Sequence, residues 1–173
     1  GDKRALQAGT SHDLGQNFAK AFDVTFQTKD NKEEFVWATS WGISTRLVGA
    51  VILTHGDDKG LRLPPKIAPI QVVVIPITKN EDEKSDVKFY LDSTLESLKN
   101  KGVRIYVDWT DNTPGYKFNE WEMKGVPIRM EVGSRDIKNQ KVVLARRDNG
   151  EKIFLSKNDI LDAVPVLLKK IQV

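Results

Sequence analysis

One arginine, Arg46, stands directly ahead of the apolar run LVGAVIL in the first third of the chain. A run this apolar predicts a buried element. If the element is a helix, the guanidinium lies in its first turn, where unpaired N–H groups and the helix dipole favour an anion, and its planar donors fit phosphate oxygens. The arrangement predicts a phosphate site. Two alternatives stay open: an arginine paired with a neighbouring carboxylate, and a short buried strand, which periodicity does not separate from a helix.

A small polar loop precedes this arginine and could form the lip of a cleft. The segment QAGTSH offers Gln7, Thr10 and His12 as side chains that could point into such a cleft. The alternative is a turn in which Asp13 caps a helix over residues 14–22. The second histidine, His55, has no partner in the sequence that would indicate acid–base catalysis.

A second candidate site lies in the C-terminal half, where basic and aromatic residues gather. Between Lys124 and Lys152 there are 8 basic and 4 acidic residues, and Tyr116, Phe118 and Trp121 lie just upstream. Proteins read single-stranded RNA by stacking bases on aromatic or guanidinium planes, while arginines and carboxylates pair with base edges and lysines hold phosphates. The cluster indicates an RNA-binding face. The alternative is a solvated basic surface, with the aromatic residues in the core.

Composition narrows the class of protein. The 173 residues include 27 Lys plus Arg and 24 Asp plus Glu, for a net charge of +3. Residues 1–65 carry 8 basic and 8 acidic side chains and residues 66–173 carry 19 and 16, so a polyanionic partner is expected to bind the second half. The lack of cysteine excludes disulfides and cysteine-ligated zinc. No signal-peptide pattern and no apolar run of about 20 residues is present, so a soluble cytoplasmic protein is the expectation.

The first part of the chain is expected to contain an antiparallel hairpin. Val24 and Phe26 alternate with polar residues, a turn follows, and residues 35–39 alternate again. Asp57 and Asp58 are adjacent acids in a glycine-flanked turn, which favours solvated or capping residues over metal ligands, and we predict no metal site. Paired prolines at residues 64–65 close this part.

The second part of the chain has the pattern of an α/β layer. The continuous β-branched run of residues 70–77 predicts a strand buried on both faces. The alternation of further strands and helices predicts helices on a mixed sheet. The other expected elements are a helix over residues 84–99, strands over 103–109 and within 123–133, a hairpin over 141–156, and a last helix over 158–173 interrupted at Pro165.

Three blocks of the chain resemble prolyl-tRNA synthetases, a family of class II aminoacyl-tRNA synthetases. The arginine-containing segment of residues 38–65 is similar to class II motif 3, QAGTSH to the substrate loop, and DNTPGYKFNEWEMKGVPIRMEVGSRD to the anticodon-binding domain. The blocks occur in the family's order and cover nearly the whole chain. The resemblance implies a partial antiparallel class II catalytic sheet over residues 1–65, followed by a mixed-sheet α/β anticodon-binding domain over residues 66–173.

The resemblance also implies an activity and a set of site residues. A prolyl-tRNA synthetase activates proline with ATP, accompanied by Mg²⁺, and transfers the prolyl group to tRNA(Pro); the parent enzyme is expected to be a homodimer. Arg46 would be the catalytic arginine, at the γ end of ATP. Among the anticodon residues, many relatives have lysine in place of Arg135. The residues implied are Gln7, Thr10, Ser44 and Arg46 for ATP, His12, Trp41 and Gly42 for proline, and Glu122, Arg129, Arg135 and Asp136 for the two guanines of the anticodon.

Motif 1, the class II dimer element, and motif 2 are not found, and both are expected before residue 1. We therefore expect these 173 residues to form no prolyl-adenylate and to retain an anticodon-binding domain that folds from about Lys66 onward. Without the rest of their sheet, the first 65 residues are expected to be partly disordered, swapped or covered by another copy.

Two alternatives to a piece of a prolyl-tRNA synthetase remain. One is a non-catalytic tRNA-binding or regulatory subunit derived from a synthetase, against which the intact Arg46 and QAGTSH speak. The other is a different class II enzyme, such as the threonyl or glycyl synthetase, against which the proline-specific pocket residues and the pair Glu122 and Arg129 speak.

Overall fold

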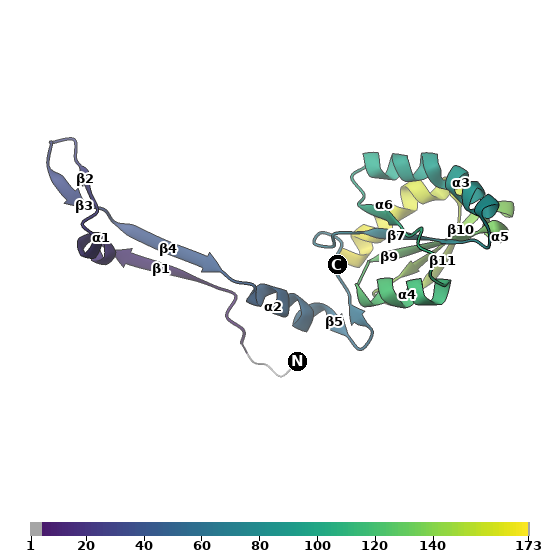
Figure 1. Ribbon diagram of the computed structural model, residues 1–173, viewed down its shortest axis with the longest axis horizontal. Coiled ribbons are helices and arrows are strands. Elements are labelled where there is room, and N and C mark those ends of the chain that lie inside the picture. Colours follow the sequence, from purple (N-terminus) through teal and green to yellow (C-terminus); the bar gives the residue numbers. More distant parts are fainter. Residues whose placement is uncertain (1–4, 173) are drawn as a thin grey trace. The chain divides into compact units, whose positions relative to one another are not determined.

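The structure, a computed structural model, describes residues 5–172 (Figure 1). The chain separates into two compact units, one ending at Thr54 and the other beginning at His55. Within the described residues, every helix is too short or too polar to cross a membrane.

The first unit is built on a two-stranded antiparallel ribbon. Strand β1 (Gly9–Gly15) pairs with β4 (Ala38–Ile43), so that Thr10 lies opposite Gly42 and Ser11 opposite Trp41. The remaining elements of this unit are α1 (Asn17–Phe22), the paired strands β2 (Thr25–Gln27) and β3 (Glu33–Phe35), and α2 (Arg46–His55).

The predicted helix cap at Asp13 is wrong. Asp13 lies inside β1, and its Oδ1 accepts a hydrogen bond from the N–H of Gly15 at 3.0 Å. Helix α1 begins after Gln16, which makes no side-chain capping bond. An aspartate can bond to the backbone two residues further on instead of to a helix end, and here that local bond prevails.

The apolar run after Arg46 forms α2, in agreement with the helical alternative, but its predicted burial is wrong for the described chain. None of the residues of α2 is buried, and Leu53 is 78% exposed. Trp41 on the neighbouring strand is 80% exposed. A two-stranded ribbon supplies no second layer, so it offers these side chains no surface on which to pack.

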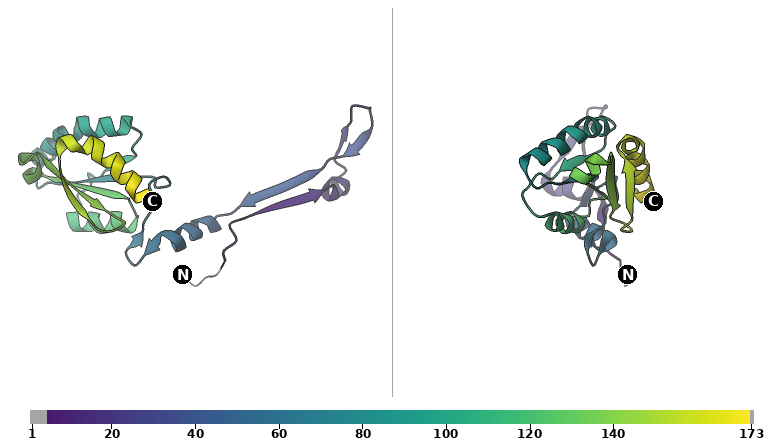
Figure 2. Two further views of the ribbon diagram at one scale, coloured as in Figure 1. Left: turned by 180° about the vertical axis from the view of Figure 1, so that it is seen from behind. Right: turned by 90° about the vertical axis from the view of Figure 1, so that its right-hand side faces the viewer.

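The second unit is an α/β domain around a five-stranded mixed sheet, as predicted (Figure 2). The strand order is β11-β10-β9-β7-β8; β7 is parallel to both of its neighbours, and β10 is antiparallel to β9 and β11. Four consecutive residues of β7, from Val72 to Ile75, are fully buried, as the β-branched run indicates. The strands are β7 (Val72–Ile77), β8 (Ile105–Val107), β9 (Ile128–Gly133), β10 (Lys141–Arg146) and β11 (Lys152–Ser156).

The side chains of β7 alternate between two layers of the core. Val72 and Val74 belong to the larger cluster, which contains residues of α3 and α6. Val73 belongs to a smaller cluster with Trp121 of α4. The sheet is therefore covered by α3 and α6 on one face and by α4 on the other (Figure 2). The helices are α3 (Glu81–Asn100), α4 (Pro114–Met123), α5 (Ser134–Lys138), the 3₁₀ turn η1 (Lys157–Asp159) and α6 (Ile160–Gln172).

Helix α6 continues through Pro165, so the predicted interruption is wrong. A proline inside a helix has no N–H to donate to the carbonyl four residues earlier. Here that carbonyl belongs to Leu161, and it accepts a hydrogen bond from Lys101 Nζ at 3.1 Å instead. The side chain of Lys101 thus replaces the missing backbone donor.

The second unit begins with a short hairpin of β5 (Gly56–Asp57) and β6 (Gly60–Leu61). Gly60 has φ 124°, and a Cβ at this position would lie 2.5 Å from the Cα of Met123 in α4. The N–H of Leu63 donates to the carbonyl of Gly125 at 3.1 Å. The sequence pattern groups residues 56–65 with the first part of the chain, but in the structure they pack against the second unit.

Candidate nucleic-acid interface

The floor of the candidate site is a row of neighbours across the sheet. Lys152 of β11 is opposite Ala145 of β10, Ala145 is opposite Arg129 of β9, and Arg129 is opposite Val73 of β7. Residues paired in this way share one face of a sheet. The row therefore brings Lys152 and Arg129 to the face on which α4 packs.

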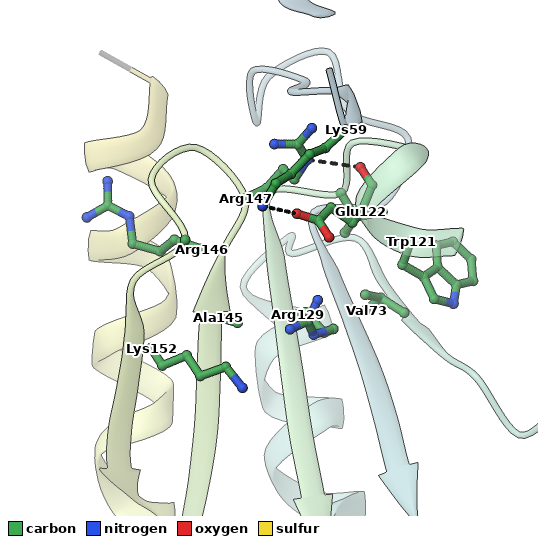
Figure 3. A pocket seen from close by; sticks show the side chains of 11 residues that line it. Lys59, Val73, Trp121, Glu122, Arg129, Ala145, Arg146, Arg147 and Lys152 are labelled. Carbon is green, nitrogen blue, oxygen red and sulfur yellow. Dashed lines mark hydrogen bonds and ion pairs between the residues drawn. The ribbon is translucent and has the colours of Figure 1, made fainter. Parts of the chain in front are cut away.

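A pocket of about 160 Å³ opens over this row (Figure 3). Trp121 and Glu122, near the end of α4, line it together with Arg129 and Lys152. Lys59, from the turn between β5 and β6, also lines it, and its Nζ lies 3.4 Å from Glu122 Oε1. A carboxylate, two lysines and an arginine thus meet beside an indole ring.

The guanidinium of Arg129 is held in a fixed plane. Its Nε and Nη2 donate to Oε1 of Glu131 at 3.0 and 2.9 Å, which is possible because residues two apart on a strand share a face. The ring of Phe118 stacks on the guanidinium at 4.2 Å from its centroid. Among the described residues nothing pairs with Nη1 of Arg129, so this nitrogen is available to an incoming acceptor.

A buried polar network lies beneath the indole of Trp121. Asp108 is 2% exposed and accepts hydrogen bonds from Trp121 Nε1 at 2.7 Å and from Thr110 Oγ1 at 2.6 Å. Lys117, 4% exposed, donates to the carbonyl of Asp108 at 3.0 Å and lies 3.7 Å from its carboxylate. Burial raises the pKa of Asp108, but the bonds from Thr110 and Trp121 and the charge of Lys117 outweigh burial, so the pKa is below its ordinary value.

Two arginines at the end of β10 are already neutralised. Arg146 donates to Asp148 at 3.0 and 2.6 Å, which raises the pKa of Arg146, and it points away from the other labelled side chains (Figure 3). Arg147 donates to Asp57 at 2.9 and 2.6 Å and to the carbonyl of Glu122 at 2.9 Å. The hydrogen bond from Arg147 is the main reason that the pKa of Asp57 is well below its usual range.

The structure brings together two of the four residues predicted to read the anticodon. Glu122 and Arg129 line the same pocket, whereas Arg135 and Asp136 lie in α5, beyond the far end of β9. The four residue steps from Arg129 to Gly133 span about 13 Å at roughly 3.3 Å per step. Asp136 Oδ2 accepts a hydrogen bond from the N–H of Gly133 at 2.8 Å and so caps α5.

The sequence reasoning missed Lys59 and Lys152 as members of the pocket. Lys152 reaches it through the register of β10 and β11, and Lys59 through the docking of the β5–β6 hairpin. The excess of basic residues between Lys124 and Lys152 was the one available signal for Lys152, which it does not single out, and Lys59 lies outside this range.

In the first unit, all four predicted ATP residues and the predicted proline residue Gly42 line one hollow of about 260 Å³. Gln7, Thr10, Gly42, Ser44 and Arg46 contribute to it. Arg46 Nη1 donates to Gln7 Oε1 at 2.7 Å, and the N–H of Arg46 donates to Ser44 Oγ at 3.3 Å. In the described chain, Arg46 is therefore paired with an amide and not with the neighbouring carboxylate of the alternative interpretation.

The residues predicted for proline are distributed over both faces of the ribbon. His12 is opposite Ser40, and Trp41 is opposite Ser11. Because side chains alternate along a strand, Trp41 lies on the face opposite to that of His12 and Gly42. Within residues 5–172, no three His, Cys, Asp or Glu side chains gather where they could hold a metal ion.

Comparison with known proteins assigns the chain to a family. Residues 71–167 match the anticodon binding domain family, a segment longer than half of the chain. The chain therefore belongs to the anticodon binding domain family.

Relatives along the whole chain are more specific and confirm the resemblance to prolyl-tRNA synthetases. A curated proline–tRNA ligase of Natranaerobius thermophilus is 52% identical over 172 residues, which cover 99% of this chain and 35% of the relative. The chloroplastic/mitochondrial proline–tRNA ligase of Arabidopsis thaliana is 56% identical over 149 residues, covering 86% of this chain and 27% of the relative. The chain thus spans about a third of the length of these relatives.

A solved structure extends the similarity to three dimensions. The crystal structure of prolyl-tRNA synthetase from Cryptosporidium parvum complexed with halofuginone and AMPPNP has a TM-score of 0.81 to this chain at 45% sequence identity. The similarity covers 98% of this chain and 35% of that one.

Proposed function

We propose that this chain is part of a proline–tRNA ligase and that its second unit binds the anticodon loop of tRNA(Pro). The observation that supports this most strongly is the pocket in which Glu122 and Arg129 lie together. Both residues fall within the segment matched to the anticodon binding domain family. The pocket has the size and the donor and acceptor groups to take a base edge from a single strand.

The chemistry of the pocket suits guanine. A guanine presents O6 and N7 as acceptors, which an arginine can contact, and its N–H groups can donate to a carboxylate. In the proposal, the free edge of Arg129 contacts the acceptors and Glu122 takes the N–H groups. Arg135 and Asp136 would contact a different nucleotide, because they lie beyond the other end of β9.

The first unit is proposed to contribute to amino-acid activation in the whole enzyme. The proline carboxylate attacks the α-phosphate of ATP and pyrophosphate leaves, which gives prolyl-adenylate; the prolyl group then passes to a tRNA hydroxyl as AMP leaves. Positioning and charge stabilisation can promote such a step without an acid–base residue. The proposed contacts are Arg46 to the γ end of ATP, Gln7, Thr10 and Ser44 to the rest of ATP, and His12, Trp41 and Gly42 to proline.

The proposal also includes Mg²⁺, an oligomeric state and a location. Mg²⁺ usually keeps several waters and binds through one or two carboxylates together with substrate phosphates. It would therefore arrive with ATP and need no cage of protein ligands. We further propose a homodimeric parent enzyme in the cytoplasm, which gel filtration and cell fractionation of the full-length protein would test.

An RNA hairpin tests the anticodon assignment directly. The chain should bind a hairpin with the loop triplet UGG about tenfold or more tightly than one with both guanines changed, since each good base contact discriminates by about 1–3 kcal/mol. Glu122→Gln keeps the shape of the side chain and should reduce the preference, whereas Glu96→Gln on the exposed face of α3 should leave it unchanged. Both affinities are measured at one fixed salt concentration. Equal binding of the two hairpins by the unaltered chain would contradict the proposal.

A further inference from the structure

The basic residues around the pocket differ in how much charge they can offer to RNA. Five of them line it, and each of the three arginines already pairs with a carboxylate, although Nη1 of Arg129 stays open among the described residues. The two lysines are more open: the side chain of Lys59 is 71% exposed and that of Lys152 is 50% exposed. Lys59 is therefore the most accessible cation at this pocket in the described chain.

The contact that Lys59 makes is weak enough to exchange. Its Nζ lies 3.4 Å from Glu122 Oε1, and the side chain of Glu122 is itself 32% exposed. Exposed pairs of this kind contribute only about 0–1 kcal/mol. A guanine that occupies the Glu122 carboxylate would displace the ammonium, which is then free to pair with another anion.

The backbone that carries Lys59 is fixed, in contrast to its side chain. Asp57, two residues earlier, is held by Arg147, whose side chain is only 6% exposed. Gly60, one residue later, packs against Met123 with no room for a Cβ. A flexible lysine stem on a fixed hairpin can move its charge over the mouth of the pocket without any change in the fold.

We infer that Lys59 is a phosphate-binding residue of the RNA site: it pairs with Glu122 in the free protein and with a backbone phosphate of the anticodon loop when Glu122 binds a base. The inference rests on the proposed function. It extends the RNA site beyond the matched segment 71–167 to the hairpin that precedes it.

A phosphate contact and a role in orienting Glu122 predict different measurements. A lysine that neutralises a phosphate positions the RNA without reading sequence, so its loss weakens binding of all sequences alike. When such a lysine binds a phosphate, counterions are released from the RNA. Each such contact contributes about 0.7 to the slope of log affinity against log salt for a single strand. A lysine that only orients Glu122 would affect the preference for UGG and leave the slope unchanged.

The test compares Lys59→Met with Lys59→Arg and with Lys88→Met, a control on the opposite face of the sheet, in α3. Binding of the UGG hairpin and of the hairpin with both guanines changed is measured between about 50 and 200 mM salt. Lys59→Met should weaken both complexes by a similar factor and lower the salt slope by about 0.7. Lys59→Arg should retain the slope, and Lys88→Met should behave as the unaltered chain.

The outcomes separate this inference from the proposed function. An unchanged slope in Lys59→Met, with or without a loss of UGG preference, would overturn the phosphate role. If the unaltered chain binds both hairpins equally but Lys59→Met still lowers the slope, base reading fails and the phosphate contact stands. If the unaltered chain binds neither hairpin, both are overturned. Melting temperatures of the variants confirm that any loss is not a loss of fold.

Discussion

Replacing Asp108 with asparagine would test whether the buried network beneath Trp121 supports the second unit. The asparagine side chain has almost the same shape, but its NH₂ group must replace one of the two oxygens of Asp108, which accept from Trp121 Nε1 at 2.7 Å and from the N–H of Thr110 at 3.0 Å. It also removes the negative charge 3.7 Å from Lys117, whose side chain is 5% exposed. The substitution thus leaves one buried donor unpaired and one buried ammonium without its counter-charge.

The magnitude follows from these two losses. An unsatisfied buried polar group costs about 1–3 kcal/mol, and breaking a buried ion pair by removing one partner costs about 3–5 kcal/mol. Because Lys117 keeps its bond to the backbone carbonyl of Asp108, we expect the lower end, about 3 kcal/mol in the free energy of unfolding. Urea denaturation followed by circular dichroism measures this loss. At an m-value of about 1–3 kcal/mol per molar, the midpoint should fall by about 1–3 M.

A nearby exposed acid provides the control. Asp111→Asn should change the free energy of unfolding by no more than about 0.5 kcal/mol, because Asp111 is exposed and away from the network. If Asp108→Asn costs less than about 1 kcal/mol, the network does not hold the unit together and the reasoning is refuted.

Acid should narrow the difference in the free energy of unfolding between the unaltered chain and Asp108→Asn. The pKa of Asp108 is lowered in the folded state, so the unfolded chain binds its proton more readily. The stabilisation is therefore complete above the unfolded pKa of about 3.9 and is lost as the pH falls through the lower, folded value. The advantage of the unaltered chain over Asp108→Asn should shrink below about pH 4; an advantage that grows on acidification would contradict this sign.

Three other results are expected. Gly60→Ala should lower the melting temperature of the second unit by several degrees, since the added Cβ would lie 2.5 Å from Met123 Cα. The control Gly49→Ala, whose Cβ would have nothing of the described chain within 4 Å, should not lower this temperature. Equal melting temperatures of the two variants would contradict the packing. Phe118→Leu should weaken UGG binding about two- to fivefold at an unchanged salt slope, because it removes the ring that holds the plane of Arg129, and a changed slope would point to unfolding instead. The 173-residue polypeptide should bind the hairpin yet catalyse no proline-dependent pyrophosphate exchange, because its relatives are about three times as long; exchange above background would refute this.

The layers of the second unit could be predicted from the sequence because local patterns determine them. The β-branched run at Val72–Ile77 has no polar face, so it fits only a strand covered on both sides. The apolar stripe of α3, with Val87, Leu91 and Leu98 buried, follows helical spacing. Both signals depend on neighbours in the sequence, and both are confirmed.

The composition of the pocket could not be predicted because it depends on pairing between distant segments. Lys152 reaches Arg129 only through two strand registers, and a shift of one residue in either would turn its side chain to the other face. The count of basic residues was misleading for a similar reason. Arg146 and Arg147 look like RNA contacts in the sequence, but Asp148 and Asp57 already pair with them.

The docking of the β5–β6 hairpin on α4 determines where the chain can be cut without damage. A polypeptide that starts at Lys66, the predicted beginning of the anticodon-binding domain, would retain Arg147 but lose Asp57, its partner. It would also uncover the surface of Gly125, which packs against Leu61 so closely that a Cβ would lie 2.5 Å away. Arg147, whose side chain is 6% exposed with the hairpin in place, would keep its bond to the carbonyl of Glu122 but lose its carboxylate, which is a source of instability at the edge of the pocket itself. A version of the second unit intended for isolated study should therefore begin at His55, so that the eleven residues ahead of Lys66 are produced as part of the domain.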